Sequence, residues 1–123
     1  MSILLWVVQI VLALAFIAAG FMKAFQPYDT MAARMSWVED YSPGTVRIIG
    51  ALEILGGVGL VLPAAIGIFP VLVPIAAIGL AIIMLLATLL HVRRQETGPM
   101  GFTIVLLALL LFVAFGRFVL APF

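Results

Sequence analysis

The sequence predicts an all-α membrane protein, an antiparallel four-helix transmembrane bundle with a short interfacial helix between the first two spans. Hydrophobic residues make up 67% of the 123 residues and charged residues only 9%, whereas soluble domains are about half apolar and about a quarter charged. The charges are also clustered, which leaves uncharged stretches long enough to cross a bilayer, about 20 residues each. These two observations exclude a free-standing soluble enzyme and a disordered chain.

Four spans are predicted within one domain, residues 1–123: residues 3–22, 46–62, 71–90 and 102–120. The uncharged stretch 54–92 is too long for one helix, and three prolines mark a turn within it, Pro63, Pro70 and Pro74. Short connections after the second and third spans make consecutive helices antiparallel neighbours. A signal peptide is the alternative for the first span, but that span lacks a basic leading segment and its apolar run is longer than usual.

The connection between the first two spans is rich in charged side chains and carries a helical pattern. Asp29 follows Pro27 as a candidate N-cap, and apolar residues then recur at helical spacing, Met31, Met35 and Val38. We therefore expect a helix from about Thr30 to Asp40 in the membrane interface, with two aromatic side chains at headgroup level, Trp37 and Tyr41. An ordered polar loop is the alternative.

Basic residues predict the orientation of the chain. The second connection has none. Those at the first and third connections are Lys23, Arg34, Arg47, Arg93 and Arg94. The positive-inside rule then places both termini outside the cytoplasm. Arg93 and Arg94 are interpreted as topology determinants and lipid-phosphate contacts. Arg117, near the end of the last span, is expected to extend outward to the interface.

Each span has one face on which polar residues recur with small ones at steps of three and four, the pattern of helices that approach closely in lipid. We expect these faces to point inward: Gln9, Ala13, Phe16, Gly20 and Lys23; Val46, Gly50, Glu53 and Gly57; Ala77, Ala81, Met84, Thr88 and His91; Thr103, Leu107, Leu110, Ala114 and Arg117. The glycines Gly20, Gly50, Gly56 and Gly57 are predicted to serve helix packing, and room for a flat ligand is the alternative.

Glu53 is the strongest candidate for a ligand- or proton-handling residue. It lies about 10 Å below the cytoplasmic interface at 1.5 Å per residue, where a carboxylate is costly unless it is paired, protonated or hydrated. The alternative is a structural ion pair. Arg47 lies about 120° round the same helix, so Lys23 of the neighbouring span is the expected partner.

His91 ends the third span on the same side as Glu53. It either satisfies the helix C-terminus or contacts a ligand and relays protons. Lys23, Arg47, Glu53 and His91 together form the candidate site. No metal site is predicted, because the chain has no cysteine and one histidine. The net charge of +1 gives no reason to expect nucleic acid as a partner.

Three segments resemble the DoxX-like family of small four-span bacterial membrane proteins: AFIAAGFMKAF, RIIGALEILGGVGLVLP and LLATLLHVRR. They occur in the family's order and carry its lysine, glutamate and histidine. The resemblance implies a location in the bacterial cytoplasmic (inner) membrane. The family takes its name from a small subunit of a thiosulfate:quinone oxidoreductase, which implies a link to membrane redox complexes. Thiosulfate itself is not transferred as a substrate.

These observations leave three functions open. The first is a membrane subunit of an oxidoreductase that binds quinone or another apolar partner near Glu53 and receives electrons from a soluble partner. The second is a non-catalytic anchor, assembly factor or lipid-binding scaffold. The third is a small transporter, a homo-oligomer with Glu53 as its coupling carboxylate.

Overall fold

The computed structural model describes residues 2–35, 41–95 and 97–122, and these residues form helices and turns without a strand. The helices are α1 (Ser2–Phe25), α2 (Tyr28–Arg34), α3 (Pro43–Gly59), α4 (Leu62–Ile66), α5 (Leu72–Arg93), α6 (Thr97–Phe115) and a π-helical turn η2 (Gly116–Leu120). Four helical segments are long and apolar enough to cross a membrane: Ser2–Phe25, Pro43–Ile66, Leu72–Arg93 and Thr97–Leu120. The predicted all-α membrane bundle is therefore confirmed.

The observed spans extend beyond the predicted ones at the end that holds α2. Helix α3 begins at Pro43, because the Ser42 side chain accepts a hydrogen bond from the Thr45 amide (3.2 Å) and proline suits the first helical position. Helix α5 continues to Arg93 and α6 already begins at Thr97. The turn predicted among the prolines contains α4, which ends at Gly67 with a left-handed φ of 71°.

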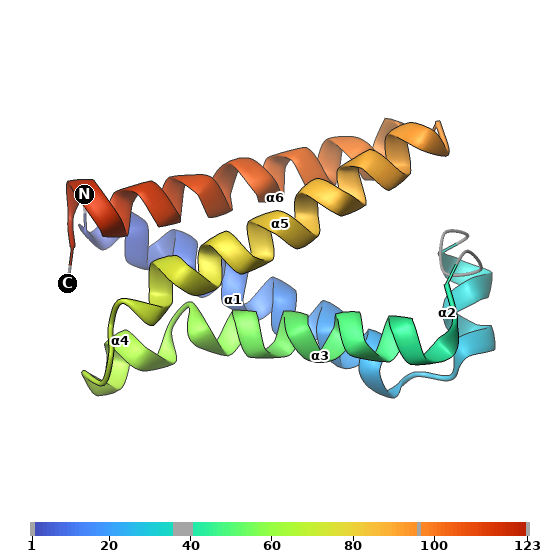
Figure 1. Cartoon of the computed structure of the whole chain (residues 1–123), viewed down its shortest axis with the longest axis horizontal. Coiled ribbons are helices and arrows are strands. Elements are labelled where there is room, and N and C mark those ends of the chain that lie inside the picture. The colour runs from blue at the N-terminus through green and yellow to red at the C-terminus, as the bar shows by residue number, and fades with distance from the viewer. Residues whose placement is uncertain (1, 36–40, 96, 123) are drawn as a thin grey trace.

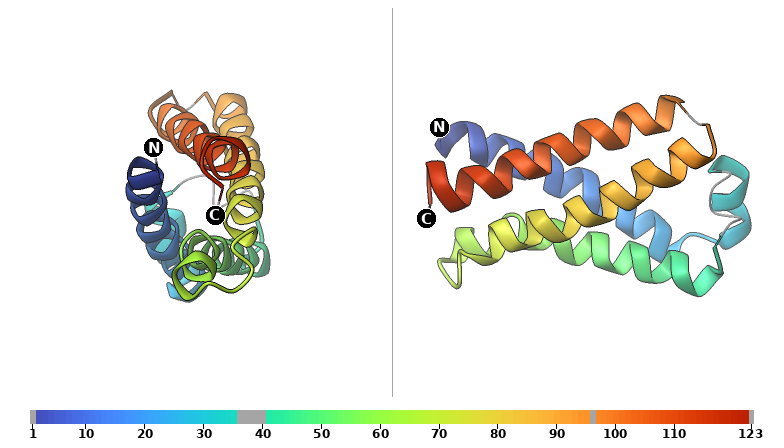
Figure 2. Two further views of the ribbon diagram at one scale, coloured as in Figure 1. Left: turned by 90° about the vertical axis from the view of Figure 1, so that its left-hand side faces the viewer. Right: turned by 45° about the horizontal axis from the view of Figure 1, so that its top comes forward.

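The bundle consists of two closely packed antiparallel pairs, α1 with α3 and α5 with α6 (Figure 1). Both termini and α4 lie at one end of the bundle, and α2 lies across the other. The pairs converge toward the end with the termini and separate toward α2, as the right-hand view in Figure 2 also shows. The fold therefore has a tight end and a wide end.

Small residues allow the helices to approach within and between the pairs. A Cβ atom on Gly50 would lie 2.6 Å from the Gly20 carbonyl oxygen, so the α1 and α3 backbones touch there. Between the pairs, a Cβ on Gly56 would lie 2.5 Å from the Leu80 side chain. The predicted inward faces are buried, apart from Leu107 and Lys23, which keep intermediate exposure.

The helix in the first connection occurs, but its predicted bounds are wrong. It covers Tyr28–Arg34, its N-cap is Pro27 rather than Asp29, and the extended backbone of Met35 ends it. Its buried residue, Met31, packs against Val46 of α3, so contact within the protein sets the helix position. The rest of the predicted helix and Trp37 fall within 36–40, outside the described residues.

The expectation that Arg117 extends outward is also wrong. The side chain is 3% exposed, and its Nε donates to the Gln9 side-chain oxygen at 2.7 Å. Its Nη1 donates to the Ser2 hydroxyl at 3.1 Å, and the Gln9 amide donates to the Leu60 carbonyl at 2.7 Å. These internal acceptors replace water, so the guanidinium has no need to reach the interface. The network joins α1, α3 and η2 at the tight end.

The Gly20–Gly50 contact predicts that an added methyl group lowers stability at Gly50 but not at a glycine that has open space around it. Gly50→Ala should lower the stability of the purified protein by about 1–3 kcal/mol, because the new Cβ would meet backbone atoms that cannot move aside. Thermal unfolding in detergent measures the change. Gly79→Ala is the matched control in another span, where no atom lies within 4 Å of the new Cβ. Equal stability for both variants would contradict the role of the contact.

Candidate functional site

A cavity of about 400 Å³ lies between the two helix pairs toward the wide end. All four long helices contribute to its wall, together with the connection that follows α2. Its polar lining residues are Lys23, Tyr41, Glu53, His91 and Thr103. The other lining residues are apolar and include Ala15, Phe16, Ala19, Ile49, Ile83, Met84, Leu86, Ala87, Leu90, Phe102 and Leu106. The site thus combines a small polar cluster with a largely apolar chamber.

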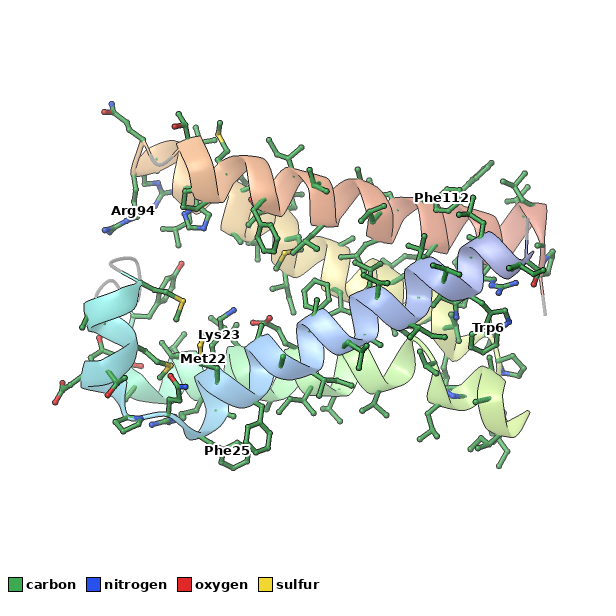
Figure 3. The ribbon with its side chains drawn as sticks, turned by 180° about the vertical axis from the view of Figure 1, so that it is seen from behind. Trp6, Met22, Lys23, Phe25, Arg94 and Phe112 are labelled. Carbon is green, nitrogen blue, oxygen red and sulfur yellow. The ribbon has the colours of Figure 1, made fainter. Side chains whose placement is uncertain are left out.

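The centre of the polar cluster is an ion pair between α1 and α3. Lys23 Nζ donates to Glu53 Oε1 at 2.6 Å, and the Glu53 and Lys23 side chains are 1% and 13% exposed. Figure 3 shows Lys23 on the side of α1 that faces α6, whereas Phe25 points away from the bundle. The predicted choice of Lys23 as the partner of Glu53 is confirmed.

Arg47 takes a different place. Its Nη1 donates to the Lys23 backbone carbonyl at 3.1 Å, close to the C-terminal end of α1. A cation is favoured there, because the last carbonyl groups of a helix carry partial negative charge. Arg47 does not line the cavity. It holds the helix end that carries Lys23, so its contribution to the site is positional.

His91 and Thr103 form the polar part of the opposite wall. His91 lies in the last turn of α5, is 7% exposed and lines the same cavity as Glu53. Thr103 of α6 accepts a hydrogen bond from Thr88 at 2.8 Å and donates to the Met100 carbonyl at 2.9 Å. This chain of hydroxyl groups links α5 to α6 beside His91. The cavity therefore has an imidazole ring on one helix pair and an ion pair on the other.

An apolar core closes the cavity on the side of the tight end. It is built from tightly buried side chains of α1, α5 and α6 and of the residue that caps α3, among them Leu12, Leu60, Leu80, Leu110 and Val113. The core lies between Glu53 and the Gln9–Arg117 network. Along this span Glu53 precedes Leu60, whose carbonyl belongs to the network, by about two helical turns. The core therefore separates the polar cluster from the tight end.

Several cavity residues were missed by the sequence reasoning. Tyr41 lines the cavity, a role that the sequence does not predict for it, and its carbonyl accepts a 2.7 Å hydrogen bond from the Tyr28 hydroxyl. Ala15 and Ala19 lie beside the inward face of α1, and a helical wheel would have shown this position without marking it as functional. No cluster of three potential metal ligands occurs among the described residues.

Fold and site together define a four-span membrane protein with an amphiphilic cavity beside a buried ion pair. Residues 7–113 match the DoxX-like family, and the chain belongs to this family. The match covers the three segments that carry Lys23, Glu53 and His91. No curated protein and no solved structure matches the chain.

The Lys23–Glu53 pair predicts strong coupling between two substitutions. Lys23→Met and Glu53→Gln should each destabilise the protein. Lys23→Met should lower the free energy of unfolding by about 3–5 kcal/mol, because it leaves the buried carboxylate of Glu53 without its partner. The double variant should lose less than the sum of the two, because no unpaired charge remains. Thermal unfolding of the four proteins gives this cycle. Additive losses would show that the two side chains do not stabilise each other.

Proposed function

We propose that this DoxX-like protein is a membrane subunit of an oxidoreductase system and binds a quinone in the cavity. One observation carries the proposal: the Lys23–Glu53 ion pair joins a buried carboxylate to a half-buried ammonium group, and it borders a mainly apolar chamber of about 400 Å³. Ligand sites combine apolar walls with a few polar groups that fix the orientation of the ligand, and their volumes are about 300–1,000 Å³. A quinone needs both parts.

The side chains of the cavity suit the chemistry of a quinone head. Lys23 lines the cavity beside Glu53, and an ammonium group is a donor that suits a quinone carbonyl oxygen. Reduction to the quinol adds two electrons and two protons. Glu53 and His91 are the groups at the cavity that can pass protons, and a soluble oxidoreductase partner supplies the electrons.

The two other functions are less well supported. A transporter needs a polar route through the bundle, but the apolar core separates the Lys23–Glu53 pair from the Gln9–Arg117 network. A purely structural anchor explains the glycine contacts and the ion pair. It gives no reason for an apolar chamber beside that pair, since unfilled space costs stability. A bound lipid-soluble molecule accounts for all three features.

The proposal predicts that quinone binding depends on the charge of Glu53. Glu53→Gln should weaken quinone binding about tenfold or more, as expected when a hydrogen-bonding charge is lost. Native mass spectrometry of protein purified in mild detergent measures the bound quinone, and assays on membranes measure its reduction. Asp29→Asn is the matched control, because Asp29 is an exposed acid that does not line the cavity. Unchanged binding and reduction in Glu53→Gln would refute the proposal.

We further propose that the chain lies in a bacterial cytoplasmic membrane with both termini outside the cytoplasm. The basic residues near the wide end support this orientation, which puts the cavity mouth on the side of a cytoplasmic electron donor. The natural chain has no cysteine, so single-cysteine variants report topology directly.

An impermeant maleimide added to intact cells should label Ile68→Cys at the tight end, because Ile68 lies in an exposed turn. It should label Thr97→Cys at the wide end only after the cells are opened. Labelling in the opposite order would reverse the proposed orientation.

A further inference from the structure

We infer that the ligand reaches the cavity sideways from the hydrocarbon, between α1 and α6, and that it carries an apolar tail that lies over Ala15 and Ala19. This inference rests on the proposed quinone site. It adds the access route, the orientation of the ligand and the residues that select for a tail.

The cavity wall includes residues that also face the membrane. Ala15 of α1 is exposed, and Phe102 of α6 is 64% exposed, yet both line the cavity. A side chain can do both only where the chamber reaches the outer surface. Figure 3 views the molecule from the side of α1, where α1 and α6 diverge toward the wide end. The chamber therefore opens laterally between these two helices.

The two flanks of the cavity differ in the size of their side chains. The flank between α3 and α5 also reaches the surface, since Leu86 is 61% exposed, but each of its lining residues is large: Ile49, Ile83, Leu86 and Leu90. On the other flank α6 contributes the large residues Phe102 and Leu106, but α1 contributes only alanines, Ala15 and Ala19. Methyl side chains leave the room that a ring and its substituent need at van der Waals distance, about 3.5–4 Å between carbon atoms. The α1–α6 flank is thus the wider route.

The order of residues along α1 gives the ligand a direction. Lys23, Ala19 and Ala15 follow each other at one-turn steps, so Ala15 lies about 12 Å from Lys23 along the helix and toward the middle of the span. A polar head at Lys23 and Glu53 then directs an attached tail past Ala19 and Ala15 into the bilayer. Phe16 and Phe102 flank this path with aromatic surfaces that suit a flat ring.

The charge of the polar cluster favours a neutral head. Glu53 already balances the ammonium group of Lys23, so an anionic lipid phosphate finds no excess positive charge at this pair. A neutral carbonyl or hydroxyl group finds a donor and an acceptor side by side. The occupant is therefore an uncharged ring that carries oxygen substituents and a long apolar tail, rather than a phospholipid.

The test measures the binding of two probes to the full-length protein in detergent: a benzoquinone with a short isoprenoid tail, and the same ring without the tail. Ala15→Phe should weaken binding of the tailed quinone about tenfold and leave the tailless ring within about twofold of the natural protein. Ala19→Phe should weaken both probes, because Ala19 lies closer to the head. Ala18→Phe is the matched control, since Ala18 is exposed on α1 and does not line the cavity.

The outcomes separate this inference from the function on which it rests. If Ala15→Phe binds the tailed quinone as Ala18→Phe does, the lateral route is wrong, while a defect in Glu53→Gln would still support the quinone site. If the natural protein binds neither quinone but retains phospholipid, both proposals are overturned. Ala15→Leu provides a smaller obstruction should Ala15→Phe fail to fold, and it should give a weaker defect of the same kind.

Discussion

The contact between the backbones of Gly20 and Gly50 determines where Lys23 and Glu53 meet at the wide end of this protein. A Cβ on either glycine would lie 2.5–2.6 Å from the carbonyl oxygen of the other, so no other residue permits this approach without a shift. The contact lies about one turn from Lys23 and from Glu53, and it brings their side chains to 2.6 Å. Close packing and a buried ion pair therefore depend on the same two positions.

The two ends of the bundle differ in how their polar groups find hydrogen-bonding partners in lipid. At the tight end, Arg117 and Gln9 satisfy each other and backbone oxygens within a closed network. At the wide end, the helix pairs diverge and the Lys23–Glu53 pair borders open space. In hydrocarbon a polar group must find an internal partner. At the wide end the ammonium and carboxylate groups of the pair therefore satisfy each other at the wall of a chamber.

Much of this arrangement follows from the sequence, because helical periodicity and the scarcity of charge act locally. The four spans, the inward faces and the Lys23–Glu53 pair could be predicted from spacing alone. The buried position of Arg117 could not, since it depends on the π-helical turn at Gly116 and on Gln9, more than a hundred residues away in the chain. Likewise the cavity depends on the angle between helix pairs, which the sequence pattern of each helix does not specify.

The ion pair also affects how the site responds to the voltage across a membrane. A single charge moved through the full potential changes its energy by about 2.3 kcal/mol per 100 mV. Lys23 and Glu53 add no net charge to the bundle while they stay paired, so the field acts only on their dipole. Binding of an uncharged molecule beside them is then insensitive to voltage. The site becomes electrogenic only when a proton passes between the pair and one face of the membrane.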